Sequence, residues 1–306
     1  MTMRIGCVGC GNMGGAILAG LARSAGQSQG QTDAYALCGY NRTASRMRPL
    51  EEAGVQVMTS PLAVAENADI IILAVKPYQM REVVGQLRPA LDANKVLVSV
   101  AAGITSGSLA QWAENACPVV RCMPNTPALV GMGVFALCLE DPKLSQSCKQ
   151  SLLQVFGTLG QCVELAEEKF TAFSALIGAG PAYVFAMMQG LVQAGVTLGF
   201  THAQSRQMVT ALFAGSARMA EQDASPLGQL RDNVCSPGGL TIAGVNVLDR
   251  AGLTGLLVDA VLAADARFAD QAEVLIKTRL AADAVGATKM DRPEWIAVHP
   301  GTNEVY

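Results

Sequence analysis

Charged and aromatic side chains are scarce in this chain of 306 residues: 15% are charged, 5% are aromatic and only two residues are histidine. The net charge of -3 leaves no basic surface of the kind that attracts nucleic acid or anionic membranes. We therefore expect neither partner. The chain is instead rich in apolar residues, 51% of the total, and its length suits two domains better than one.

We also expect no targeting segment, because no basic region, apolar segment and cleavage site precede the first apolar run. The nine cysteines are an odd number scattered over a long chain, which is typical of reduced thiols rather than of a disulfide framework. Both observations predict a cytoplasmic protein. Cys7 and Cys10 have the spacing of a redox or metal pair, but no second pair stands at zinc spacing. We interpret them as packing residues and expect no metal.

One long stretch of the chain has no charged side chain: no Asp, Glu, Lys or Arg stands between Lys169 and Arg206. Such a stretch is long enough to cross a bilayer. It also contains Gly180, Pro181 and several polar residues, and it lacks an aromatic belt and flanking basic clusters. We therefore predict a helix buried on nearly all sides, as happens where two subunits share one core.

The first half of the chain alternates short apolar runs with helix-periodic segments. Strands are predicted at residues 4–8, 34–39, 55–58, 69–74, 96–100 and 119–123, with two further ones at 134–139 and 162–165. Helices are predicted after Met13, after Thr43, and at 80–87, 108–113 and 145–156. This is the pattern of an α/β fold, a doubly wound Rossmann domain with a parallel sheet, which we assign to residues 1–166.

Strand signals stop at Glu167. Helical periodicity then holds through residues 173–198, 203–221 and 240–275. We predict a second, all-helical domain at residues 167–276 for substrate binding and dimerisation, followed by a tail at 277–306 whose role the sequence does not reveal. Residues 26–32, rich in Gln, Ser and Gly, are predicted to form a surface loop.

A glycine pattern follows the first strand and opens the first helix. It reads Gly9-Cys10-Gly11-Asn12-Met13-Gly14, and its glycines let backbone amides approach a pyrophosphate at the helix N-terminus. The alternative is a plain glycine-rich turn between a strand and a helix. The context of strand and helix favours a dinucleotide site that includes all of these residues except Cys10.

The second strand ends at Asn41 and Arg42, where a site selective for NAD would place a carboxylate. Asn41 can bond a 2′-phosphate and Arg42 can pair with it, so NADPH is predicted, with NADH a weaker donor. In the alternative, Arg42 is only a solvated surface residue.

Two more strands end in polar motifs. Ala74-Val75-Lys76-Pro77 follows the fourth strand, and Asn125 follows the sixth. Ligands of open α/β sheets bind beyond the carboxyl ends of the strands, so we predict cofactor contacts at Ala74, Lys76, Pro77 and Asn125. Alternatively, the prolines there simply terminate the strands.

The segment from Arg231 to Thr241 is a polar hinge that enters a helix-periodic stretch. Two glycines expose amides, the helix adds its dipole, and Thr241 offers a hydroxyl, which suits an anionic substrate. The alternative is an ordinary N-cap. A hydroxy-acid dehydrogenase on this plan usually needs a basic lysine, but none stands between Lys169 and Lys277. His202 is interpreted as a helix start.

The ordered set of motifs resembles the pyrroline-5-carboxylate reductase family over about residues 3–275. The motifs are residues 11–14, 75–77, 123–127, 178–183 and, most specific of all, 232–241. The resemblance implies NAD(P)H-dependent reduction of a cyclic imine, 1-pyrroline-5-carboxylate, to L-proline. It also implies an interlocked helical homodimer that can assemble into larger rings, up to a decamer.

The resemblance further assigns site residues. Amides of the hinge, at Val234, Ser236, Gly238 and Gly239, would hold the substrate carboxylate, and the catalytic Thr241 would lie beside the ring nitrogen. Ala179 and Leu240 depart from the residues common in the family. A different class remains open: a nucleotide-sensing protein that kept the Rossmann domain and lost catalysis, against which the intact hinge argues.

Overall fold

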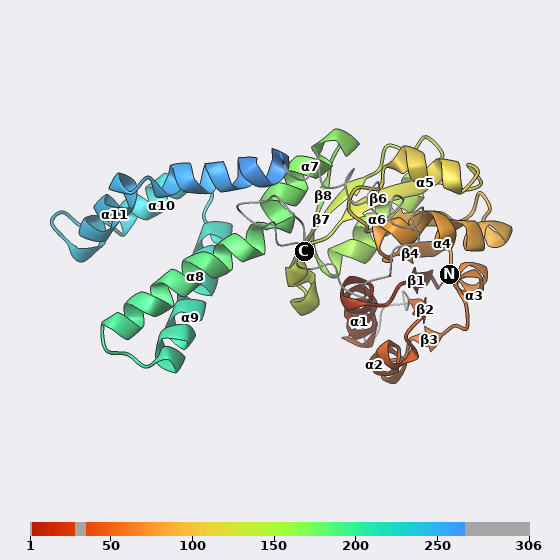
Figure 1. The fold of residues 1–306 in the computed structure, drawn as a ribbon, viewed down its shortest axis with the longest axis horizontal. Coiled ribbons are helices and arrows are strands. Elements are labelled where there is room, and N and C mark those ends of the chain that lie inside the picture. Colours follow the sequence, from red (N-terminus) through yellow and green to blue (C-terminus); the bar gives the residue numbers. More distant parts are fainter. Residues whose placement is uncertain (1, 28–34, 267–306) are drawn as a thin grey trace, which may run out of the picture.

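The computed structural model describes residues 2–27 and 35–266 (Figure 1). One eight-stranded sheet with the order β3-β2-β1-β4-β5-β6-β7-β8 forms the N-terminal half. The strands are β1 (Arg4–Val8), β2 (Ala36–Tyr40), β3 (Gln56–Val57), β4 (Ile70–Leu73), β5 (Val96–Ser99), β6 (Val119–Met123), β7 (Gly133–Cys138) and β8 (Gly160–Glu164). This order places the first six strands in the doubly wound arrangement that the sequence predicts.

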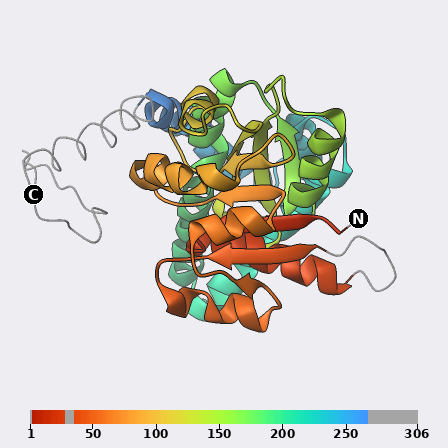
Figure 2. The same ribbon diagram turned by 90° about the vertical axis from the view of Figure 1, so that its right-hand side faces the viewer.

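Helices cover both faces of this sheet (Figure 2). They are α1 (Asn12–Gln27), α2 (Arg48–Glu52), α3 (Pro61–Asn67), α4 (Met80–Leu87), α5 (Ser106–Trp112) and α6 (Gln146–Gly157). Side chains of α1, α2 and α6 share one core, and those of α3, α4 and α5 share the other. In β4, Ile70 and Ile72 belong to the first core, whereas Ile71 and Leu73 belong to the second. A strand buried on both faces has this continuous apolar sequence.

One pairing differs from a purely parallel sheet, because β7 runs antiparallel to β6 while β8 is parallel to β7. The physical reason is the connection. Only residues 124–132, including the short 3₁₀ helix η4 (Thr126–Val130), join β6 to β7, and a parallel crossover needs a dozen residues or more. The other 3₁₀ helices are η1 (Ala44–Arg46), η2 (Pro77–Gln79), η3 (Arg88–Ala90) and η5 (Glu167–Lys169).

The second half is helical and extends away from the sheet as arms (Figure 1). Its elements are α7 (Phe170–Phe173), the π-helical turn η6 (Ser174–Gly178), α8 (Gly180–Thr197), α9 (His202–Gln222), α10 (Leu227–Asn233) and α11 (Leu240–Arg250), then a helical segment at residues 253–266. α8 and α9 pack against each other as one arm. The other arm holds α10, α11 and residues 253–266.

Several predicted boundaries were wrong. The helix predicted over residues 173–198 begins earlier and contains a π turn, and the one predicted over 240–275 is interrupted at Gly252, where φ is 71°. α10 was not predicted, because part of it was taken for the polar hinge. Most of the predicted loop at 26–32, the end of the last helix and the tail at 277–306 lie outside the described residues.

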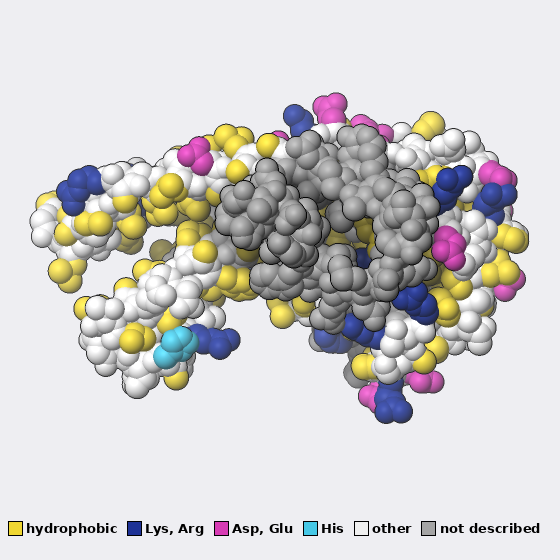
Figure 3. Space-filling view, viewed as in Figure 1, with side chains coloured by type: hydrophobic (Ala, Val, Ile, Leu, Met, Phe, Trp, Pro, Cys, Tyr) yellow, Lys and Arg dark blue, Asp and Glu magenta, His cyan; other side chains and the backbone are white. Residues whose placement is uncertain are grey.

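The helix predicted to be buried on nearly all sides is not buried by its own chain. The stretch Glu167–Thr197 is long and apolar enough to span a membrane, and 11% of its most apolar window is buried within the chain. Phe185, Leu191 and Val196 are exposed on α8, and apolar side chains are spread over both arms (Figure 3). The burial that the sequence predicts is therefore not provided by the described residues of a single chain.

Candidate cofactor and substrate site

The glycine turn between β1 and α1 is shaped by close backbone contacts. Gly9 has a φ of 97°, in the left-handed region that favours glycine, and its N–H donates to the carbonyl of Tyr40 at 2.9 Å. A Cβ on Gly14 would lie 2.4 Å from the carbonyl oxygen of Gly9, whereas one on Gly11 would meet nothing within 4 Å. Gly14 thus packs the helix onto the turn, and Gly11 leaves open space in front of it. This is the arrangement that a pyrophosphate cradle requires.

Positively charged side chains follow β2 beside this turn. Arg42 is exposed, and the Asn41 side chain donates to the carbonyl of Thr43 at 3.1 Å. Arg46, which the sequence analysis missed, donates to the side-chain oxygen of Asn12 at 2.9 Å. The signal that could have found Arg46 was the recurrence of arginine within a few residues after the strand. These arginines place cationic groups next to the glycine turn.

The end of β4 lies next to the same turn. The N–H of Ala74 donates to the carbonyl of Val8 at 2.9 Å, which brings the two strand ends together. Lys76 is exposed in extended conformation, and Pro77 begins η2. The structure therefore gathers Ala74, Lys76 and Pro77 at the carboxyl edge of the sheet, as expected.

Asn125, at the end of β6, is buried and hydrogen-bonded within the chain. Its side-chain nitrogen donates to the carbonyl of Ile177 at 3.3 Å, and its side-chain oxygen accepts from the N–H of Val134 at 2.9 Å. These bonds tie it to η6 and β7. Its predicted contact with a cofactor stays a prediction.

The predicted substrate loop connects α10 to α11. Gly238 has a φ of 67°, and Gly239 is the N-cap of α11. Because glycine has no side chain, the cap residue offers nothing that would occupy the first amides of this 11-residue helix. Thr241 is exposed in the first turn. The cap residue is therefore neither Ser nor Thr, and a helix start without a side-chain cap from that residue suits an anion.

The structure does not bring this loop to the glycine turn. α10 and α11 lie in an arm on one side of the molecule, whereas α1 lies beside the sheet on the other (Figure 1). Within the described part of one chain, the predicted cofactor residues are grouped and the predicted substrate residues are grouped, but the two groups are separate.

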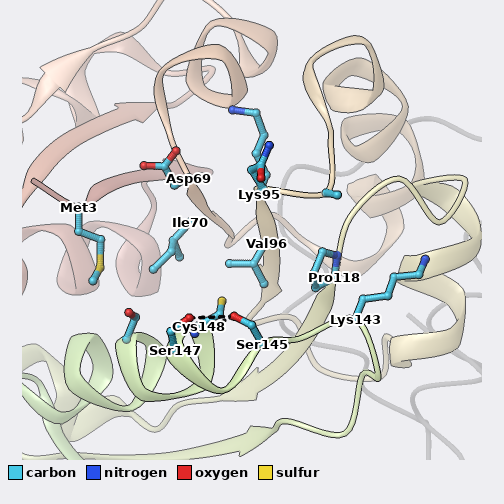
Figure 4. A pocket seen from close by; sticks show the side chains of 13 residues that line it. Met3, Asp69, Ile70, Lys95, Val96, Pro118, Lys143, Ser145, Ser147 and Cys148 are labelled. Atoms are coloured by element: carbon cyan, nitrogen blue, oxygen red, sulfur yellow. Dashed lines mark hydrogen bonds between the residues drawn. The ribbon is translucent and has the colours of Figure 1, made fainter. Parts of the chain in front are cut away.

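A hollow of about 460 Å³ lies elsewhere, at the amino ends of the strands (Figure 4). Its cationic side chains already have partners: Lys95 donates to the carbonyls of Ala65 and Ala68 at 2.7 and 2.9 Å, and Lys143 donates to that of Asn115 at 2.7 Å. Ligands of such sheets bind at the opposite, carboxyl edge. The hollow is not the predicted site.

The thiols behave as the sequence predicts. All nine cysteines are free, and Cys7 and Cys10 are buried. A hydrogen bond with Cys10 and burial raise the pKa of the Cys7 thiol, and burial raises the pKa of Cys38 to about 11. A neutral, buried thiol such as that of Cys7 is a poor nucleophile, and the side chains of Cys7 and Cys10 both belong to the hydrophobic core. Cys7 and Cys10 therefore pack, and His202 begins α9 as expected.

Comparisons with known proteins match both halves of the chain. Residues 4–103 match the family model of the coenzyme F420-dependent NADP oxidoreductases, and residues 167–271 match that of the pyrroline-5-carboxylate reductase dimerisation domain. The pyrroline-5-carboxylate reductase of Pisum sativum is 34% identical over 263 residues, covering 86% of this chain and 94% of that enzyme.

Solved structures of pyrroline-5-carboxylate reductases are also similar to this chain. A pyrroline-5-carboxylate reductase from Coxiella burnetii has a TM-score of 0.80 at 30% identity, with 88% of this chain and 98% of that chain covered. The Plasmodium falciparum enzyme, solved with NADP bound, has a TM-score of 0.74 at 29% identity, with 87% and 97% covered. With its glycine turn, its helical arms and an identity above 30% to a relative matched over nearly its full length, the chain belongs to the pyrroline-5-carboxylate reductase family.

Proposed function

We propose that this protein reduces 1-pyrroline-5-carboxylate to L-proline, the final step of proline biosynthesis, with NADPH as the preferred hydride donor. The proposal rests mainly on one observation. This member of the family has two helices whose N-termini begin at glycines, so that no side chain of the glycine blocks the approach of an anion. The glycine turn opens α1, and Gly239 opens α11. Each presents backbone amides to an anion, the first to a pyrophosphate and the second to a carboxylate.

In the proposed site, Gly9, Gly11, Asn12, Met13 and Gly14 hold the pyrophosphate. Asn41 and Arg42, joined by Arg46, surround the 2′-phosphate, and Ala74, Lys76 and Pro77 line the crevice beyond the strands. Asn125 lies buried at the end of β6. Charge-assisted bonds from arginine to phosphate are stronger than neutral ones. They would therefore favour NADPH over NADH.

The chemistry asks little of the protein. When bound, NADPH supplies a hydride, which adds to the imine carbon while the ring nitrogen keeps the proton with which it arrives. The chain has to hold the substrate carboxylate on the amides of Val234, Ser236, Gly238 and Gly239, and to orient the ring nitrogen with the hydroxyl of Thr241. Such positioning can supply roughly 7–11 kcal/mol of the barrier.

We further propose that the active form is at least a homodimer. A second chain would cover the exposed apolar residues of α8 and α9, and it would bring its own α10–α11 loop to the sheet edge of the first. The match of residues 167–271 to a dimerisation model supports this. Under this proposal the apolar helix serves packing between chains rather than a membrane. A decameric ring and a cytoplasmic location also remain expectations.

The test is the loss of reduced-nicotinamide absorbance on adding 1-pyrroline-5-carboxylate, run with NADPH and with NADH and with proline identified as product. We expect faster turnover with NADPH. If the folded, cofactor-binding protein oxidises neither, the proposed reaction is wrong and a nucleotide-sensing role takes its place.

A variant makes the test specific to the loop. Thr241→Ala should lower turnover about tenfold or more, because the ring nitrogen loses its orienting hydroxyl, and it should leave NADPH affinity nearly intact. Thr254→Ala removes an exposed threonine from the following helical segment and is the matched control. Equal turnover in the two variants would remove Thr241 from the site.

A further inference from the structure

The junction between the sheet and the helical arms contains a backbone irregularity. After α7, the chain makes the π turn η6, in which the N–H of Ala179 donates to the carbonyl of Ser174, five residues earlier, at 2.9 Å. π turns interrupt the regular ladder of a helix and often occur at functional sites. Pro181 follows in the first turn of α8.

This sequence deprives one carbonyl of its α-helical main-chain donor. In an α-helix the carbonyl of Ile177 would accept from the N–H of residue 181, but Pro181 has none. The next N–H, that of Ala182, donates instead to the carbonyl of Ala179 at 2.9 Å. A partly buried carbonyl without a donor is costly, so a partner from outside the helix is required.

Asn125 is that partner. Its side-chain nitrogen lies 3.3 Å from the carbonyl oxygen of Ile177, while its side-chain oxygen accepts from the N–H of Val134. The residue is 7% exposed. One buried amide therefore joins the carboxyl end of β6, the start of β7 and the π turn. A second tie comes from the hydroxyl of Tyr183, which donates to the carbonyl of Ala175 at 3.3 Å.

We infer that Asn125 is a positioning residue that replaces the N–H missing at Pro181 and so fixes the direction in which α8 leaves the sheet. The inference rests on the proposed function for its consequence. Every described residue after η6, including the substrate loop, follows this junction in the chain. The tie therefore sets where the substrate lies relative to the hydride donor, rather than how tightly the cofactor binds.

The experiment is a double-mutant cycle between Asn125→Ala and Pro181→Ala in the full-length protein. Asn125→Ala should lower kcat/KM for 1-pyrroline-5-carboxylate about tenfold or more, since small displacements of reacting groups are expensive, with the Kd for NADPH within about twofold. Pro181→Ala restores an N–H that can donate to the carbonyl of Ile177. Alone it should change little, and together with Asn125→Ala it should recover a factor of about three or more.

Ser174→Ala is the matched control, because the Ser174 hydroxyl donates to the carbonyl of Phe170 at 2.7 Å and makes no tie to the sheet. Its kcat/KM should stay within about twofold of the original. If Asn125→Ala weakens NADPH binding as much as it lowers kcat/KM, Asn125 is a cofactor ligand and the inference is wrong. It is also wrong if the proline change recovers nothing.

Hydrogen exchange separates this inference from the proposed reaction. The amides of residues 174–182 should exchange faster in Asn125→Ala and slow again in the double variant, whether or not the protein reduces 1-pyrroline-5-carboxylate. If Asn125→Ala alone does not fold, recovery of folded protein in the double variant supports the tie, and failure of the double variant to fold overturns it.

Discussion

Gly14 and Gly15 are neighbours in α1, yet a methyl group at the two positions would meet different surroundings. At Gly14 the added carbon would lie 2.4 Å from the carbonyl oxygen of Gly9 and 2.9 Å from the sulfur of Cys7. At Gly15 it would make an ordinary contact of 3.6 Å with the carbonyl oxygen of Cys10. The same helix thus supplies a test position and its control.

Gly14→Ala should reduce the free energy of unfolding by about 1–3 kcal/mol, because a packed site is overfilled, and should weaken NADPH binding. Gly15→Ala should be neutral or stabilising by up to about 1 kcal/mol, because alanine favours a helix. Denaturant unfolding without cofactor and a binding titration would measure both. Equal losses in the two variants would show that Gly14 has no special packing role.

Arg42 follows β2, where a site selective for NAD would place a carboxylate and this chain has none. Arg42→Ala should weaken NADPH about tenfold or more and NADH much less, because only NADPH carries the 2′-phosphate that a guanidinium can pair with. Arg88→Ala removes the same charge at the end of α4 and should alter neither affinity. Parallel titrations decide the matter, and equal losses for the two cofactors would sink the phosphate role.

At this scale the sequence was informative where backbone conformation dictates residue type. The glycine turn was predictable because only glycine allows a φ of 97° at Gly9. Arg46 was not, since its bond to Asn12 depends on how the loop after β2 folds back. Neither was the tie from Asn125 to Ile177, which joins residues far apart in the chain.

Among the elements, η5 and α7 attach the arms to the sheet through one buried cation. Arg121 in β6 lies 3.2 Å from the carboxylate of Glu167 and 4.7 Å from the ring centre of Phe170. The same carboxylate accepts from the N–H of Ser106 at 2.7 Å. The side chain of Arg121 is 9% exposed and that of Glu167 is 28% exposed. Removing one partner should therefore change the free energy of unfolding by a different amount than removing the other.

Glu167→Ala should lower the free energy of unfolding by about 1–3 kcal/mol, because it leaves a buried guanidinium without its charge partner. Arg121→Met should cost less, since an apolar side chain of similar length replaces the buried charge and Glu167 keeps access to water. Glu168→Ala, an exposed neighbour, controls for the loss of one negative charge. Urea titrations rank the three, and a larger loss for Arg121→Met would contradict this account.

The elements themselves were largely predictable, because a short apolar run rich in β-branched residues, such as Ile70–Leu73, is typical of a strand buried on both faces. The direction in which neighbouring strands pair was less predictable. The antiparallel course of β7 follows from the short connection through η4 and not from the composition of the strand. α10 was missed because its last residues, 231–233, were taken for the polar hinge.

For the whole molecule, the exposed apolar residues of the arms predict an interface between chains. Phe185→Glu places a charge on α8 at a side chain that is 65% exposed, and it should shift the protein from dimer to monomer, because a charge in an apolar interface is costly. Val57→Glu makes the same change on the edge strand β3 and should leave the mass unchanged. Light scattering would measure both, and a Phe185→Glu protein that remains a dimer would place the interface elsewhere.

The separation of the α10–α11 loop from the glycine turn has a consequence for mixtures of defective chains. Under the proposed pairing, each active site takes its cofactor edge from one chain and its substrate loop from the other. Two variants, one impaired only at the glycine turn and the other only at the loop, would each be inactive alone. Mixed and reassembled, they would form hybrids with one fully defective site and one intact site. Two losses would then complement each other, which a site contained in a single chain could never do.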